Sequence, residues 1–148
     1  MPSEIVTSLQ EGYKLTIILI DNNGFASIGG LSKSIGSEGF GTKYKYRNKQ
    51  TGLLEGEPLP VDLAKNAESL GASVYKASDV ASFNEALIEA RKEEKTTVIH
   101  IVTVPERKMA GYGYAWWDVP VAEVSKSASV QKARGNYDKE KKNQRYFF

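Results

Sequence analysis

One segment constrains the fold of this chain more than any other. Residues 15–20 read LTIILI, an unbroken run of aliphatic and β-branched side chains. Successive side chains of a strand point to opposite faces, so a run without polar alternation predicts a strand covered on both faces, as in a parallel sheet. Residues 96–104, TTVIHIVTV, have the same character with one histidine inside. The sequence therefore predicts a buried, mostly parallel sheet.

The remaining elements alternate with these strands. Helices are predicted over residues 4–13, from Asp62 to Gly71 and from Asp79 to Lys95, because capping residues flank apolar positions at helical spacing. A short strand is predicted over residues 73–77. The order helix, strand, long loop, helix, strand, helix, strand predicts an α/β fold, an open three-layer sandwich with a mostly parallel sheet.

Length and composition predict one domain with an extension. A chain of 148 residues with 41% hydrophobic content suits one core. We expect residues 1–104 to form the α/β domain, with a glycine-rich loop over residues 28–56, and residues 105–148 to form an aromatic and basic C-terminal extension. Residues 1–104 carry 11 Lys/Arg against 13 Asp/Glu, whereas residues 105–148 carry 9 against 5. The positive charge is therefore concentrated in the extension.

Composition also excludes some classes of protein. The absence of cysteine excludes disulfides and thiolate metal sites and fits a reducing compartment. The longest apolar run is far shorter than the roughly 20 residues that cross a bilayer, and the first residues lack the basic start of a secretory signal. We expect a cytoplasmic protein without membrane contact.

The strand over residues 15–20 stops abruptly on Asp21, Asn22, Asn23 and Gly24. Ligands of open α/β sheets bind at the carboxyl ends of the strands, where this polar turn falls. An Asn side chain and a carbonyl at a glycine turn both offer neutral oxygens that suit Mg²⁺. A simple polar turn after a buried strand is the alternative interpretation of the same residues.

Residues 3–25, SEIVTSLQEGYKLTIILIDNNGF, resemble the second half of the fingerprint of thiamine diphosphate-dependent enzymes. In that family, the Asn side chain and the carbonyl two residues later bind the Mg²⁺ that anchors the diphosphate. The resemblance implies the diphosphate-binding fold, Asn22 and Gly24 as metal ligands, and Asn22, Asn23, Gly24 and Phe25 as cofactor-binding residues. Asp21 stands where many relatives carry a first Asn, a tolerable departure because the second position is the ligand.

The first half of that fingerprint, Gly-Asp-Gly, does not precede Glu4, and its spacing would place it just before residue 1. The resemblance therefore implies the C-terminal part of a longer enzyme, a fold truncated at the N-terminus and inactive by itself. The rest of the full-length enzyme and further copies of it, in a homo-oligomer, would be its partners. No catalytic residue is indicated.

Two further stretches are more specific than the turn. Residues 27–42, SIGGLSKSIGSEGFGT, and residues 111–125, GYGYAWWDVPVAEVS, are similar to a group of these enzymes that hydrolyses a C–C bond in a cyclic diketone, trihydroxycyclohexane-dione, during inositol catabolism. An acetolactate synthase-like carboligase is the alternative within the family, and a non-catalytic α/β binding module is the alternative outside it.

Other residues invite functional interpretations that we do not favour. His100 lies in a predicted buried strand, where a hydrogen-bonded core imidazole is expected, because a single histidine builds no metal cluster. An aromatic group is expected either to cover the sheet or to contact a ligand or another subunit; its members are Tyr112, Tyr114, Trp116 and Trp117. The basic tail, with Lys132, Arg134, Lys139, Lys141, Lys142 and Arg145, is interrupted by acids, so we expect a solvent-exposed terminus and no nucleic-acid binding.

Overall fold

The computed structural model describes residues 2–103 and 119–143. These residues divide into two compact units, and each is described by itself. The sheet unit contains residues 2–23 and 60–103, and the loop unit contains residues 24–59 and 119–143.

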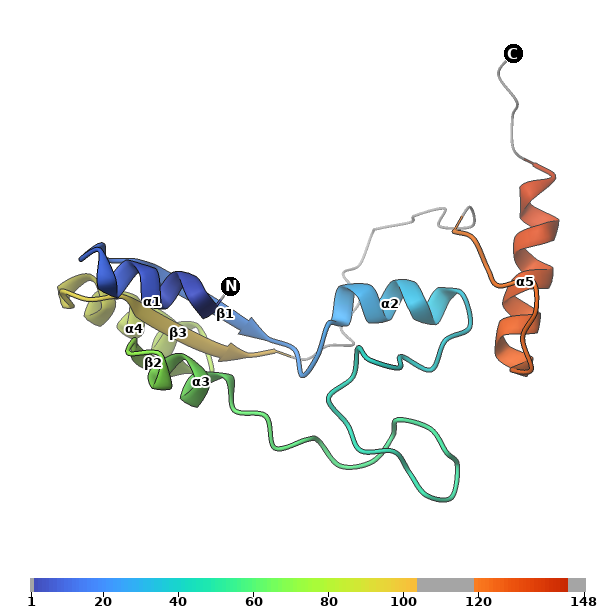
Figure 1. Ribbon diagram of the computed structural model, residues 1–148, viewed down its shortest axis with the longest axis horizontal. Helices are drawn as coiled ribbons and strands as arrows, with labels where there is room; N and C mark the ends of the chain where they lie inside the picture. Colours follow the sequence, from blue (N-terminus) through green and yellow to red (C-terminus); the bar gives the residue numbers. More distant parts are fainter. Residues whose placement is uncertain (1, 104–118, 144–148) are drawn as a thin grey trace, which may run out of the picture. The chain divides into compact units, whose positions relative to one another are not determined.

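The sheet unit is built on three parallel strands in the order β1-β3-β2 (Figure 1). Its elements are α1 (Pro2–Gln10), β1 (Thr16–Asp21), α3 (Leu63–Ser69), β2 (Ser73–Ala77), α4 (Val80–Lys92) and β3 (Thr97–Val102). Each of these lies within a few residues of its predicted position. The predicted α/β fold with an open parallel sheet is confirmed.

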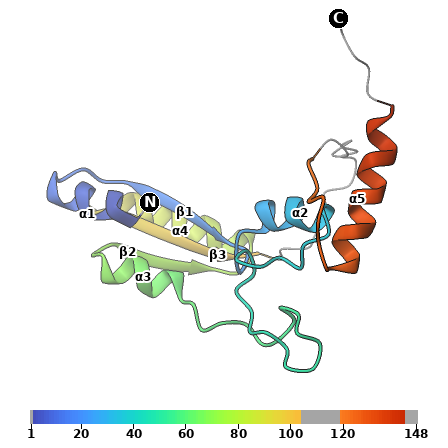
Figure 2. The ribbon, with the colours of Figure 1, turned by 45° about the vertical axis from the view of Figure 1, so that its right-hand side comes forward.

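Helices cover both faces of this sheet and make three layers (Figure 2). One core cluster joins α1 and α3 to one face, and its buried members are Ile5, Ala67, Ala72 and Val98. The other joins α4 to the opposite face, and its buried members are Ala77, Ala86, Ala90 and Ile99. The central strand β3 is therefore the most buried element, with Ile99 completely inaccessible.

The prediction that residues 15–20 are covered on both faces is wrong for one face. Ile17 and Leu19 pack into the cluster beneath α1 and α3. Ile18 and Ile20 point the other way and are 47% and 63% exposed. The reason is the position of β1 at an edge of the sheet, because α4 packs against β2 and β3.

The predicted N-caps of two helices are confirmed. The Asp62 carboxylate accepts the backbone N–H of Lys65 at 2.9 Å at the start of α3. Asp79 accepts the N–H of Ser82 at 2.8 Å, and the Ser82 hydroxyl accepts the N–H of Asp79 at 3.1 Å. This reciprocal capping box satisfies donors that the first turn of α4 leaves without intrahelical partners.

The loop unit contains two helices, α2 (Ala26–Ser34) and α5 (Ala128–Lys141). The prediction of a loop over all of residues 28–56 is wrong at its start, because α2 occupies residues 26–34. Gly29 and Gly30 each disfavour a helix by about 1 kcal/mol relative to alanine, so the sequence does not indicate a helix here. A Cβ on Gly29 would lie 2.9 Å from the Thr42 hydroxyl oxygen, so packing accounts for one of these glycines.

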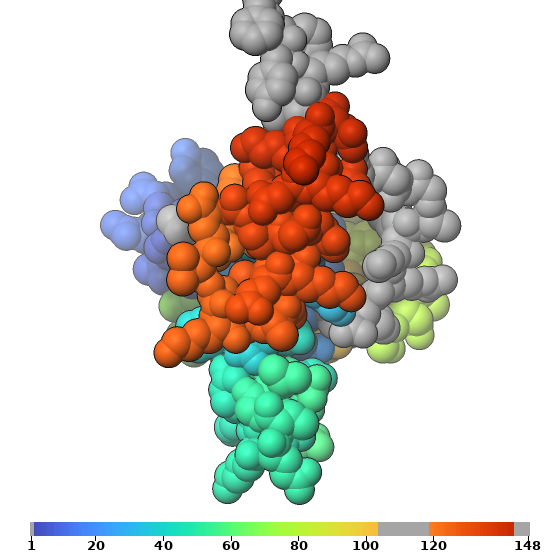
Figure 3. Space-filling model, turned by 90° about the vertical axis from the view of Figure 1, so that its right-hand side faces the viewer, coloured from blue at the N-terminus to red at the C-terminus, as the bar shows by residue number. Residues whose placement is uncertain are grey.

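Figure 3 shows residues 119–143 in orange and red and the glycine-rich segment in cyan and green. The Ser129 hydroxyl at the start of α5 donates to the Gly36 carbonyl at 2.7 Å. The C-terminal extension thus contains a helix, α5. The aromatic group of residues 112–117 and the last residues 144–148, with Arg145, lie outside the described residues.

Candidate functional site

The predicted site begins where β1 ends, at Asp21. The backbone N–H of Thr103, directly after β3, donates to the Asp21 carbonyl at 2.7 Å. The Thr103 hydroxyl donates to the same oxygen at 3.3 Å. The end of the edge strand is therefore tied to the end of the central strand, at the edge of the sheet where α/β folds bind their ligands.

The Asp21 side chain makes two further hydrogen bonds. Its Oδ1 accepts the backbone N–H of Asn23 at 2.8 Å, the geometry of an Asx turn. Its Oδ2 lies 3.0 Å from Nε2 of His100, and both side chains are only 10% exposed. Because a carboxylate accepts hydrogen bonds and donates none, Nε2 carries the proton. One carboxylate thus links the turn after β1 to the central strand.

Asn23 has a backbone conformation that most residues avoid. Its φ is +57°, in the left-handed region, and it is the single non-glycine residue of that kind among the described residues. Asn populates this region more readily than most residues with a Cβ, so it suits this position of the turn. The half-buried Asn22 lies between Asp21 and this constrained residue.

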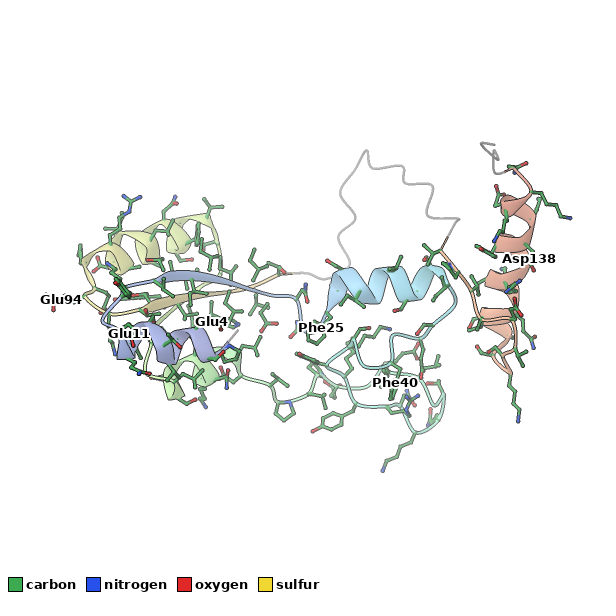
Figure 4. The ribbon with its side chains drawn as sticks, turned by 45° about the horizontal axis from the view of Figure 1, so that its top comes forward. Glu4, Glu11, Phe25, Phe40, Glu94 and Asp138 are labelled. Carbon is green, nitrogen blue, oxygen red and sulfur yellow. The ribbon has the colours of Figure 1, made fainter. Side chains whose placement is uncertain are left out.

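The turn continues in the loop unit at Gly24. Gly24 forms an antiparallel bridge with Lys43, and the Phe25 N–H donates to the Thr42 carbonyl at 2.9 Å. A Cβ on Gly24 would lie 2.1 Å from that carbonyl oxygen, and its φ is +150°, so this position requires glycine. The Phe25 ring, at the start of α2 in Figure 4, contacts Tyr44 edge-on with the ring centroids 6.0 Å apart.

The structure places the predicted residues Asn22, Asn23, Gly24 and Phe25 directly after β1, at the carboxyl end of a parallel strand. Their roles as ligands of a metal and a cofactor stay predictions. His100 is buried and hydrogen-bonded, as expected, but its partner was not predicted. The sequence contains an acid at the end of one strand and a lone histidine in another strand. Their contact could be predicted only if the register between the two strands were known.

The described helices include none with the length and hydrophobicity that a bilayer crossing requires.

Comparison with known proteins identifies the family. Residues 1–101 match the family model described as "Thiamine pyrophosphate enzyme, C-terminal TPP binding domain", where pyrophosphate is the older word for diphosphate. A protein of Bacillus cereus named 3D-(3,5/4)-trihydroxycyclohexane-1,2-dione hydrolase 1 is 44% identical over 131 residues, which cover 88% of this chain and 20% of that protein. A hydrolase of the same name, without the number, from Geobacillus thermodenitrificans is 44% identical over 134 residues, or 90% of this chain and 21% of that protein.

The chain thus spans about a fifth of the length of the curated relatives it matches. The resemblance stated for residues 3–25 is confirmed, because the family model includes them. The similarity to the diketone hydrolases is likewise confirmed by the names of these relatives. The chain belongs to the thiamine pyrophosphate enzyme family, whose C-terminal TPP-binding domain it carries over residues 1–101.

Proposed function

We propose that this chain is the diphosphate-binding part of a longer hydrolase that depends on thiamine diphosphate and Mg²⁺. The enzyme would cleave a C–C bond in a cyclic diketone, a trihydroxycyclohexane-dione, in inositol catabolism. One observation carries the proposal. A constrained polar turn follows a parallel strand, in a chain that is 44% identical over 131 residues to a hydrolase named for that substrate.

The chemistry of the turn fits a magnesium diphosphate. The described residues include no group of three His, Cys, Asp or Glu side chains that could hold a metal. The turn instead offers neutral oxygens, the amide of Asn22 and the carbonyl of Gly24, separated by one residue. Mg²⁺ is typically held by few protein ligands together with phosphate oxygens and water, and it prefers oxygen donors. A carboxylate from the remainder of the longer protein would complete this set.

Thiamine diphosphate, when bound, supplies the electron sink that cleavage next to a ketone requires. The residues of this chain do the holding. Asn22 and Gly24 would ligate the cation, and Asn23 and Phe25 would border the diphosphate. Asp21 keeps the turn in shape through its bond to the Asn23 N–H. We assign no catalytic residue within the chain.

The chain covers about a fifth of its relatives, so the proposed activity is that of the longer protein. We propose that the full-length protein is at least a dimer, and that these residues by themselves are inactive. The basic α5 helix has no assigned role in this proposal.

The first experiment tests cofactor binding by the full-length protein. Calorimetry with thiamine diphosphate, at increasing Mg²⁺ concentrations, measures the Kd of the cation. Asn22→Ala should raise that Kd at least tenfold, because it removes a ligand oxygen. Asn66→Ala, at an exposed position of α3, is the matched control and should leave it unchanged. Equal Mg²⁺ affinity in the wild type and Asn22→Ala would refute the metal assignment, and cofactor binding without any Mg²⁺ dependence would favour a non-catalytic module.

The second experiment separates the two reactions considered within the family. The full-length protein, loaded with thiamine diphosphate and Mg²⁺, is incubated with the trihydroxycyclohexane-dione or with pyruvate. We expect loss of the diketone with formation of a ring-opened acid, and no acetolactate. Acetolactate formation from pyruvate without ring opening would assign the protein to the carboligases instead.

A further inference from the structure

His100 lies on the same face of the sheet as the Asp21 carboxylate. Its Cα pairs with Leu19 in the parallel register of β1 and β3. Asp21 follows Leu19 by two positions, so both side chains of β1 point to the face that α1 and α3 cover. The imidazole therefore reaches diagonally across the strands, along a distance that a long side chain spans. This geometry gives the observed 3.0 Å between Nε2 and Oδ2.

The two oxygens of Asp21 have different partners, and this fixes the orientation of the carboxylate. Oδ1 accepts the Asn23 N–H at 2.8 Å, whereas Oδ2 accepts from His100. With the Asp21 side chain only 10% exposed, Oδ2 has little access to water. Without the imidazole, the carboxylate must rotate towards solvent to find a donor, because an unpaired buried charge is costly. That rotation moves Oδ1 away from Asn23 and releases the turn.

Asn22 lies between the two points that this carboxylate holds. On one side, the Asp21 carbonyl is tied to Thr103. On the other, the Asn23 N–H is tied to the Asp21 side chain. The conformation of Asn22 therefore depends on the carboxylate, and the carboxylate depends on His100. Residues that orient a metal ligand in this way affect metal affinity without touching the metal.

We infer that His100 is a positioning residue for the cation of this site. Through the hydrogen bond from Nε2 to Asp21, it holds the turn in the conformation that presents Asn22 to Mg²⁺. The inference rests on the proposed function, since it presupposes that Asn22 is a ligand. It adds a residue of the central strand to a site that otherwise consists of the turn alone.

The test compares two substitutions of equal length in the full-length protein. His100→Gln keeps an N–H donor near the position of Nε2, whereas His100→Met has the same shape as glutamine and no donor. Calorimetry at saturating thiamine diphosphate should give a Mg²⁺ Kd raised roughly tenfold in His100→Met, a typical effect of losing an outer partner of a metal ligand. His100→Gln should stay within about threefold of the wild type, which a merely space-filling role would not predict.

Two further variants control for stability and folding. Ile99→Val removes one methyl group from the neighbouring, fully buried position of β3. It should lower the melting temperature without changing the Mg²⁺ Kd. If His100→Met does not fold, His100→Asn replaces it, because the shorter amide retains a donor that does not reach Oδ2. His100→Asn should then show the weakened Mg²⁺ binding.

The outcomes separate this inference from the proposed function. If Asn22→Ala weakens Mg²⁺ binding but the donor-lacking His100 variant binds as the wild type does, the positioning role is refuted and the proposed function stands. If Asn22→Ala has no effect on Mg²⁺ binding, both are refuted. Equal weakening in the glutamine and methionine variants would also overturn the inference, because the donor would then make no difference.

Discussion

Gly24 lies so close to Thr42 that a Cβ on the glycine would stand 2.1 Å from the threonine carbonyl oxygen. This contact accompanies the hydrogen bond from the Phe25 N–H to the same oxygen. The proposed ligand carbonyl therefore belongs to a residue whose backbone is held at close range by a distant segment of the chain.

The first prediction concerns this close approach. Gly24→Ala should destabilise the protein by more than about 2 kcal/mol, because the new methyl group meets backbone atoms and the φ of +150° is unfavourable for alanine. Gly30→Ala is the matched control, since a Cβ there meets nothing within 4 Å and lies inside α2. It should stabilise the protein by about 0.5–1 kcal/mol. Denaturant unfolding of both variants measures the difference, and equal stabilities would contradict the close contact between Gly24 and Thr42.

The second prediction concerns the left-handed residue of the turn. Asn23→Gly should be tolerated, because glycine adopts a φ of +57° without strain. Asn23→Val should lower the free energy of unfolding by roughly 1–3 kcal/mol, because a β-branched residue is strongly disfavoured in the left-handed region. Thermal unfolding of the wild type and both variants measures whether the glycine variant is more stable than the valine variant. A valine variant as stable as the glycine variant would argue against a left-handed turn.

The third prediction concerns a buried hydroxyl at the other end of the sheet. Thr96 Oγ1 lies 2.7 Å from the Ser8 hydroxyl and accepts the Leu15 N–H at 3.1 Å, which ties α1 and the start of β1 to β3. Thr96→Val keeps the volume but removes the acceptor of the Leu15 N–H, whereas the Ser8 hydroxyl keeps its bond to the Ile5 carbonyl at 2.8 Å. The lost bonds should cost about 1–3 kcal/mol. Thr97→Val is the control, because the Thr97 hydroxyl makes a long bond to the Lys95 carbonyl at 3.3 Å. Urea unfolding should show a clearly larger loss for Thr96→Val, and similar losses would contradict this account.

The fourth prediction concerns acid stability. The N–H of Ser82 and its hydroxyl hold the pKa of Asp79 below its usual value of 3.8. A lowered folded-state pKa means that the cap stabilises the protein above the unfolded pKa, and that this contribution is lost as the pH falls through the folded value. Asp79→Ala should therefore lower the melting temperature at pH 7, and its difference from the wild type should shrink below about pH 4. A difference that stays constant down to about pH 2 would show that the charge of Asp79 plays no part.

The elements of the sheet unit could be predicted because their signals are local. The strand over residues 73–77 was predicted with the bounds that β2 has, and Asp62 and Asp79 were identified as caps. Capping depends on residues three positions apart, and strand formation depends on side chains within one run. The helix α2 was not predicted because it contains Gly29, a residue with low helix propensity. Gly29 fits there because a side chain would collide with Thr42, and this distant contact cannot be inferred from neighbouring residues.

The site was predictable only in part. Residues 22–25 could be identified because a polar turn follows an apolar strand and resembles a known fingerprint. His100 could not be connected with Asp21, since the two residues are 79 positions apart. The exposure of Ile18 and Ile20 could not be predicted either, because an apolar run has the same composition in a central strand as in an edge strand such as β1.

The sequence by itself determined where the strands and helices of the sheet unit form, where the polar turn falls and to which family the chain belongs. The tertiary structure decided which strand lies in the centre, and it decided that the imidazole of His100 meets the carboxylate of Asp21. The physical reason is that a parallel register is selected by the packing of both sheet faces at once, so a side chain acquires its distant partner only when the whole sheet has formed.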